Sequence, residues 1–152
     1  MLSSAGQITV KIPAQLSALV ELGEQLRAFL SLIPDLAEPE IILYNIELAV
    51  QEIAVNIVKH SYAHYPGEIL MSVALSDVPL QLTIVLEDNG ISFDPDAIPE
   101  PRLGEIQEHG FGLFLVRQLM DEVEYRSENE QNCWRLVKTL QRIQDPMASE
   151  TQ

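Results

Sequence analysis

The chain has 152 residues, of which 47% are hydrophobic, enough for one domain with a full core. It carries 23 acidic and 9 basic residues, and this excess of negative charge argues against a nucleic-acid or anionic-membrane partner. The single cysteine, Cys133, excludes an intrachain disulfide and favours a reducing compartment. No signal peptide and no apolar run near the roughly 20 residues that cross a bilayer are recognised. We therefore expect a cytoplasmic protein.

The N-terminal part is predicted to form one strand and one helix. Gln7–Ile12 alternates between apolar and polar residues, as a strand does, and is followed by Pro13. Ala14–Leu32 places apolar residues at helical spacing. Asp35–Glu40 is a polar link in which Pro39 is placed to begin the next helix.

Asn45–Tyr62 is predicted to be the central helix of the fold. One broad apolar face groups Ile46, Ala49, Val50, Ile53, Ala54, Ile57 and Val58. Beside that face Glu52 and Asn56 are spaced i, i+4, and Lys59 and His60 continue the same strip. The strip is either a functional edge of a buried helix or an ordinary solvated face, and this helix alone favours the solvated face.

The remaining elements alternate between strands, one long connection and one helix. The predicted strands are Glu68–Ser76, Leu80–Glu87, Glu124–Ser127 and Cys133–Leu140, and the last two form a hairpin around the polar turn Glu128–Asn132. Asp88–His109 is long for a connection and is interpreted as a lid, and Gly110–Val123 is a predicted amphipathic helix. Hairpin-linked strands imply a mixed, mostly antiparallel sheet with the helices on one face, a two-layer α+β sandwich. Residues 1–140 form the single domain, and Gln141–Gln152 is a polar tail that we expect to fray.

Two further motifs lie at the ends of predicted elements. Asp88-Asn89-Gly90 follows an apolar strand, so its aspartate can accept a hydrogen bond from a flat donor such as an adenine amino group, although the motif alone fits an ordinary turn. Gly110-Phe111-Gly112-Leu113 opens a helix whose exposed N–H groups could meet phosphate. Alone it equally fits a simple joint between loop and helix.

Taken together and in order, the three motifs resemble the N, G1 and G2 boxes of the GHKL ATP-binding superfamily. The matching residues are Glu52, Asn56 and His60, then Asp88 and Gly90, then Gly110, Gly112 and Leu113. Within that superfamily the chain is most similar to anti-sigma-factor serine kinases of the RsbW/SpoIIAB type, from about Ile8 to Leu140.

The resemblance implies a Bergerat-type sandwich that binds ATP or ADP with Mg²⁺ under a lid. The resemblance implies that Glu52 is the general base and that Asn56 is the Mg²⁺ ligand. It places Asp88 and Gly90 at adenine, and it makes Lys59 and His60 phosphate-side or structural partners. The residues that it places at the phosphates are Gly110, Phe111, Gly112 and Leu113. The implied protein partners are a sigma factor and a small antagonist of the STAS type, and the implied assembly is a homodimer.

Two departures from the family pattern bear on activity. Ser92 stands where the G1 box usually has a second glycine, and Glu108-His109 precede Gly110 where some relatives place a basic residue. Arg102 is the only arginine nearby in the lid. The leading hypothesis is a switch kinase that phosphorylates a protein serine, and the alternative is a non-catalytic binding module that uses ATP to set its conformation. A sensor histidine kinase fits less well, because only one helix precedes Asn45 where a phosphoacceptor hairpin is needed.

Overall fold

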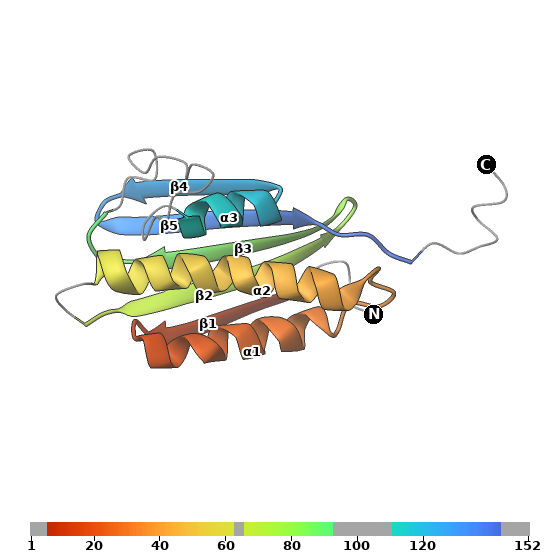
Figure 1. The fold of residues 1–152 in the computed structure, drawn as a ribbon, viewed down its shortest axis with the longest axis horizontal. Helices are drawn as coiled ribbons and strands as arrows, with labels where there is room; N and C mark the ends of the chain where they lie inside the picture. The colour runs from red at the N-terminus through yellow and green to blue at the C-terminus, as the bar shows by residue number, and fades with distance from the viewer. Residues whose placement is uncertain (1–5, 63–65, 93–110, 144–152) are drawn as a thin grey trace, which may run out of the picture.

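The computed structural model describes residues 6–62, 66–92 and 111–143, and it shows one antiparallel sheet covered by helices (Figure 1). The five strands lie in the order β1-β2-β3-β5-β4. Their bounds are β1 Gln7–Pro13, β2 Glu68–Asp77, β3 Leu80–Asp88, β4 Glu122–Glu128 and β5 Gln131–Thr139. All four pairings between them are antiparallel.

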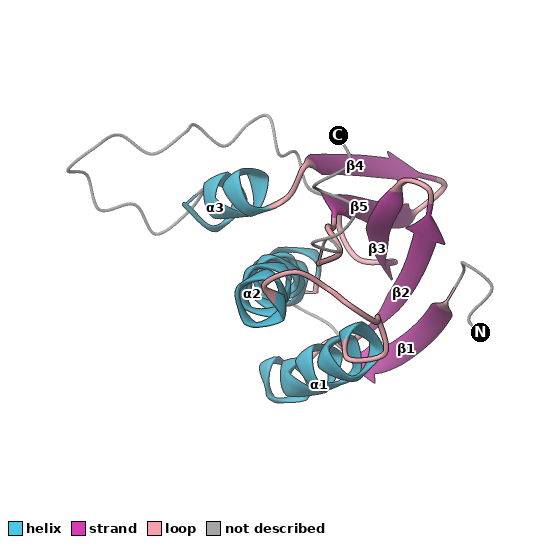
Figure 2. Cartoon of the chain, turned by 90° about the vertical axis from the view of Figure 1, so that its right-hand side faces the viewer, coloured by secondary structure: helices cyan, strands magenta, loops and turns pink. Residues whose placement is uncertain are grey.

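The helices α1, α2 and α3 lie side by side on one face of this sheet, with α2 in the middle (Figure 2). They span Leu19–Leu30, Pro39–Asn56 and Phe111–Leu119, and a short 3₁₀ turn, Leu16–Ala18, precedes α1. The predicted two-layer α+β sandwich is therefore confirmed.

The core lies between the two layers, because each strand turns alternate side chains toward the helices. On β3 the inward residues Leu82, Ile84 and Leu86 are fully buried. The predicted apolar face of the central helix is buried against them, with only Val58 partly exposed.

The central helix begins six residues earlier than predicted, at Pro39, and ends in a π-helical turn, η2, Ile57–Ser61. Proline is well tolerated at a first helical position because it lacks only an N–H that has no partner there. The expectation of no bilayer-length apolar run needs correction, because the 23-residue helix Pro39–Ser61 contains an 18-residue window with a mean hydropathy of 1.5, enough by length and composition alone to cross a membrane. A core helix of a soluble protein meets the same criterion, and this one packs between α1 and α3.

The last helix is shorter than the predicted Gly110–Val123, because the chain turns into β4 after Leu119. Val123 belongs to β4, where it pairs with Leu136. Two contacts fix the turn: Lys138 Nζ donates to Leu119 O over 2.9 Å, and Asp121 N donates to Val137 O over 2.9 Å.

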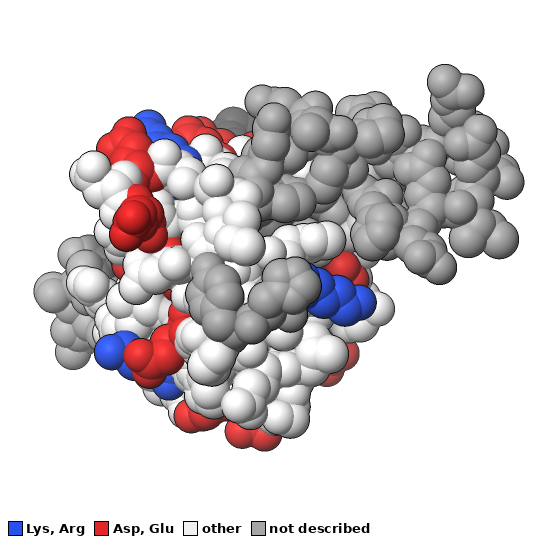
Figure 3. Space-filling view, turned by 90° about the vertical axis from the view of Figure 1, so that its left-hand side faces the viewer, with Lys and Arg blue, Asp and Glu red and all other residues white. Residues whose placement is uncertain are grey.

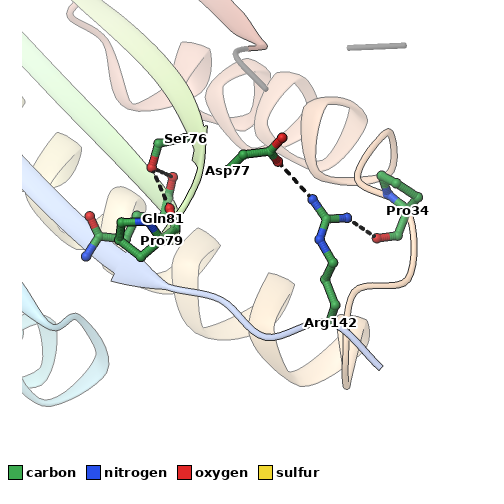
Figure 4. A network of polar contacts seen from close by, with 6 residues as sticks. All are labelled: Pro34, Ser76, Asp77, Pro79, Gln81 and Arg142. Carbon is green, nitrogen blue, oxygen red and sulfur yellow. Dashed lines mark hydrogen bonds and ion pairs between the residues drawn. The ribbon is translucent and has the colours of Figure 1, made fainter. Parts of the chain in front are cut away.

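The start of the predicted C-terminal tail is held in place by the loop between α1 and α2. Arg142 donates to Pro34 O and to Asp77 Oδ1, each over 3.0 Å (Figure 4). Backbone hydrogen bonds join Ala37 N to Gln141 O and Ile143 N to Asp35 O. The expectation of fraying is therefore wrong for residues 141–143, and residues 144–152 lie outside the described part of the chain.

Candidate functional site

Asp88, the last residue of β3, carries a buried carboxylate with one oxygen in use and the other free. Its side chain is 3% exposed. Oδ1 accepts from Gly90 N over 2.9 Å and from Asn132 Nδ2 over 2.8 Å. Oδ2 is buried and has no hydrogen-bond partner among the described residues. A buried acceptor left in this state is energetically unfavourable unless a ligand supplies the donor.

The electrostatic setting of Asp88 agrees with its geometry. Burial raises the pKa of this carboxyl above its usual range, while the Asn132 amide, the Gly90 N–H and the nearby Ser61 hydroxyl lower it to a smaller extent. The charge is thus costly in the free protein, because the effect of burial exceeds that of these hydrogen bonds. A planar N–H donor placed at Oδ2 would relieve that cost.

The loop after Asp88 packs closely against the end of η2. Ile91 N donates to Ser61 O over 2.9 Å, and Asn89 N donates to the Tyr62 hydroxyl over 2.7 Å. A Cβ atom on Gly90 would overlap the Ser61 backbone, so only glycine lets the two segments approach this closely. In this structure Gly90 lies against the Ser61 backbone, and its place beside adenine, which the family resemblance implies, stays a prediction.

Asn132, at the start of β5, belongs to the same cluster although sequence analysis assigned it to a polar turn. It is 1% exposed and lies opposite Asp88 in the register of β3 and β5. The turn is shorter than predicted, because Asn129 and Glu130 alone make it, both with positive φ. That shortening moves Asn132 into the strand, and no local sequence signal marked it as part of a site.

The second half of the site is formed by α2 and α3. Glu52 is partly buried on α2, and a Cβ atom on Gly112 at the start of α3 would overlap its Oε2. Leu113, the next residue, is 2% exposed and anchors the first turn of α3 in the core. The N and G2 motifs are therefore in direct contact, although 60 residues separate Glu52 from Gly112 in the sequence.

The other predicted site residues are only partly placed. Asn56, one turn beyond Glu52, is partly buried, whereas Lys59 and His60 lie on the π-helical turn with exposed side chains. Gly110 and the side chain of Phe111 lie outside the described residues, as do Arg102, Glu108 and His109 of the predicted lid. Ser92, the last described residue before that gap, is exposed.

Within residues 6–62, 66–92 and 111–143, no group of three or more His, Cys, Asp and Glu side chains could hold a metal. On the face shown in Figure 3, Lys and Arg side chains lie in small separate groups beside Asp and Glu side chains.

Comparison with known proteins places this geometry in a family. The model of the histidine kinase-like ATPase domain matches residues 12–138, nearly the whole described chain. The chain belongs to that family. The predicted GHKL resemblance is thereby confirmed, and it rests on a match that includes both halves of the site.

Within the family, the chain is similar to bacterial serine-protein kinases. Serine-protein kinase RsbW of Bacillus thuringiensis (strain Al Hakam) is 31% identical over 109 residues, which span 66% of this chain and 66% of that protein. RsbW proteins of Bacillus cereus (strain AH187) and Bacillus anthracis (strain A0248) match to the same extent.

Two solved structures share the fold at lower identity. The RsbU and RsbW domains of Rv1364c from Mycobacterium tuberculosis superpose with a TM-score of 0.66 at 20% identity, over 91% of this chain and 33% of that one. The histidine kinase domain of the blue-light activated kinase EL346 from Erythrobacter litoralis gives 0.54 at 19% identity, over 85% and 62%. Both confirm the histidine-kinase-like ATPase fold.

Proposed function

We propose that this protein is an ATP-binding anti-sigma factor and serine-protein kinase. In one state it binds a sigma factor, and in another it phosphorylates a serine of a small STAS-type antagonist, as expected of a partner-switching pathway. The main observation behind this proposal is that Oδ2 of buried Asp88 has no hydrogen-bond partner among the described residues. Glu52 also contacts Gly112 on the same face of the sheet. Similarity to RsbW supports the choice of a serine kinase within the family.

The base of ATP fits the Asp88 half of the site. The adenine 6-amino group is a planar N–H donor, and Asp88 Oδ2 is an acceptor without a protein partner in the described chain. A hydrogen bond to a charged group contributes about 1.5–3 kcal/mol, roughly 10- to 150-fold in affinity. Asp88 therefore supplies a large part of the recognition of adenine in this proposal.

The phosphates fit the other half, where α3 begins. N–H groups at Gly110 and Gly112 would meet the phosphate oxygens at the positive end of the α3 dipole. Mg²⁺, when bound, neutralises phosphate charge, and Asn56 would be its protein ligand. Lys59 and His60 lie one turn farther along and would approach the phosphates from solvent.

Glu52 is the residue we assign as general base. It would take the proton of the substrate serine hydroxyl while the serine oxygen bonds to the γ-phosphorus and the bond from that phosphorus to ADP breaks. The partly buried position of Glu52 on α2, against Gly112, keeps its carboxylate beside the proposed phosphate site. Phosphoserine and ADP are the products.

Assembly and location complete the proposal. We propose a cytoplasmic homodimer, because RsbW-type kinases are expected to dimerise and the single Cys133 suits a reducing compartment. Sedimentation velocity tests the dimer, since a sedimenting mass of twice 17.0 kDa is the expected result.

Transfer of phosphate to a captured partner tests the kinase assignment. The protein is immobilised and exposed to lysate of its own host with Mg·ATP, and eluted small proteins are measured by intact mass. We expect one partner to gain a single phosphate with the wild type and none with Glu52→Gln. Glu40→Gln, which alters an exposed carboxylate in the first turn of the same helix, is the matched control and should leave transfer unchanged.

The result also separates the two functional hypotheses. Asn56→Ala should abolish Mg·ATP binding under both, because the metal loses its only assigned protein ligand. Capture that depends on ATP but adds no phosphate would contradict the kinase and support the binding module. Unchanged transfer by Glu52→Gln would remove Glu52 from its assigned role.

A further inference from the structure

Asn132 carries a buried amide that joins the last three strands of the sheet beside Asp88. Its Oδ1 accepts from the Tyr125 hydroxyl over 3.1 Å and from Ser127 Oγ over 2.8 Å, both on β4. Its Nδ2 donates to Asp88 Oδ1 over 2.8 Å and to Gly90 O over 2.9 Å. A side chain that is 1% exposed thus uses both ends of its amide.

The orientation of that amide is fixed by its surroundings. A carboxylate and a backbone carbonyl only accept hydrogen bonds, so the NH₂ end must face Asp88 and Gly90. The opposite end meets two hydroxyl groups, which can donate. Turning the amide over would place oxygen against oxygen at Asp88, in a region that water does not reach.

This fixed donor determines which oxygen of Asp88 is left for a ligand. Oδ1 already receives the Asn132 amide and the Gly90 N–H, whereas Oδ2 receives nothing from the described residues. Rotation of the carboxylate would break both bonds to Oδ1. The carboxylate is therefore held in one orientation before any ligand arrives.

We propose that Asn132 is a positioning residue for base selection, which holds Asp88 so that Oδ2 alone is presented to the 6-amino group of adenine. The proposal rests on the nucleotide-binding part of the proposed function. It assigns the preference for a base with a 6-amino group to a pair of residues on β3 and β5, of which only Asp88 touches the base.

The test compares two ligands that differ only in the recognised group. Binding of ADP and of purine riboside 5′-diphosphate, which lacks the 6-amino group, is measured by calorimetry for the wild type and for Asn132→Ala. We expect the wild type to prefer ADP by roughly tenfold or more, the worth of a hydrogen bond to a charged acceptor. Asn132→Ala should lose most of that preference by weakening ADP binding, with binding of the analogue changed less than about twofold.

Ser127→Ala is the matched control, because it removes one hydroxyl from the same amide while the Tyr125 hydroxyl remains. It should keep the preference for ADP within about twofold of the wild type. An equal loss for both ligands in Asn132→Ala would show a purely structural role and overturn the proposal. A wild type that binds neither ligand would instead overturn the proposed nucleotide site itself, and the inference with it.

A second measurement covers the case in which Asn132→Ala does not fold. In a structure of the wild-type ADP complex, we expect the 6-amino group on Asp88 Oδ2 and the Asn132 amide still on Oδ1. An Asn132 amide that has left Asp88 in the complex, or a 6-amino group bound elsewhere, would contradict the proposal.

Discussion

The two halves of the site are constructed differently. The Asp88 half lies at the ends of strands, and its parts are joined by direct hydrogen bonds among Asp88, Gly90 and Asn132. The Glu52 half lies on two helices, where Gly112 and Glu52 meet by close packing. One half is a cross-linked polar cluster in the sheet, and the other is a contact between a glycine and the end of a flexible side chain.

Because of this difference, we expect the sheet and the helices to have different roles in the site. A buried polar cluster whose members are joined by several hydrogen bonds specifies a single arrangement of its groups, and the carboxylate it holds has one oxygen left for a base before binding. The Glu52 side chain, which ends against Gly112, can move aside when phosphate binds. We therefore expect added side-chain volume to destabilise the fold in the Asp88 half, called here the base half. In the Glu52 half, called here the phosphate half, it should leave the fold stable and slow phosphate transfer.

Among the changes that compare the two halves, replacing Asp88 with asparagine should have the largest effect on ADP binding. Oδ1 would keep its donors, but an NH₂ group would replace Oδ2 and face the adenine amino group, donor against donor. ADP affinity, measured by calorimetry, should fall at least about tenfold, the lower value for a lost hydrogen bond to a charged group. Glu87→Gln, on the adjacent outward-facing residue of β3, is the control, and retained affinity in Asp88→Asn would refute the assignment of Asp88 to the base.

The same substitution should not weaken the fold at neutral pH. Because the folded pKa of Asp88 is raised, ionisation in the unfolded chain comes first as pH rises, so the wild type loses stability between the unfolded and folded pKa values. Asparagine has no such loss. Urea unfolding should show Asp88→Asn at least as stable as the wild type at neutral pH, with the variant's relative advantage shrinking as the pH falls through the raised pKa.

Alanine at the two site glycines compares the halves directly. At Gly90 the new Cβ meets the backbone of Ser61, which cannot move without breaking the loop, so we expect a loss of about 1–3 kcal/mol in the free energy of unfolding. At Gly112 it meets only the Glu52 carboxylate, which can move aside, and a helix gains up to about 1 kcal/mol from alanine in place of glycine.

Gly112→Ala should therefore fold at least as well as the wild type and transfer phosphate more slowly, because Glu52 is displaced. Chemical denaturation and the phosphate-transfer assay measure the two effects separately. Equal destabilisation by both substitutions would show that the phosphate half is as rigid as the base half and would contradict the proposed difference between them.

Much of the sandwich could be predicted from local patterns. Alternation in β2 and β3 and the apolar face of α2 are properties of short stretches, and they identified the layers and the inward residues. The same patterns brought Glu52, Asp88 and Gly112 to notice, since each lies at the edge or end of a strongly periodic element.

Local patterns could not predict the role of Asn132 or the hydrogen bonds that hold residues 141–143 in place. Asn132 acquires its role from the register of β3 and β5, which pairs it with Asp88 across 44 residues of sequence. Arg142 depends likewise on a loop more than 100 residues earlier, at Pro34. Strand register and loop docking are set by the packed core, so a polar residue in a stretch that reads as a turn or tail gives no sign of them.

Replacing Lys138 should have the smallest effect on stability, because this residue contacts α3 at the end away from the phosphate site. Its ammonium donates to Leu119 O, the last residue of α3, where a positive charge also complements the helix dipole. Lys138→Met keeps the partly buried stem and removes the donor, so thermal unfolding should show a loss of about 0.3–1 kcal/mol. Lys11→Met, at an exposed lysine of β1, should lose less than this. If the phosphate half adjusts only at the first turn of α3, Lys138→Met will leave ADP affinity within about twofold of the wild type; a larger loss would mean that the whole helix moves as one body when nucleotide binds.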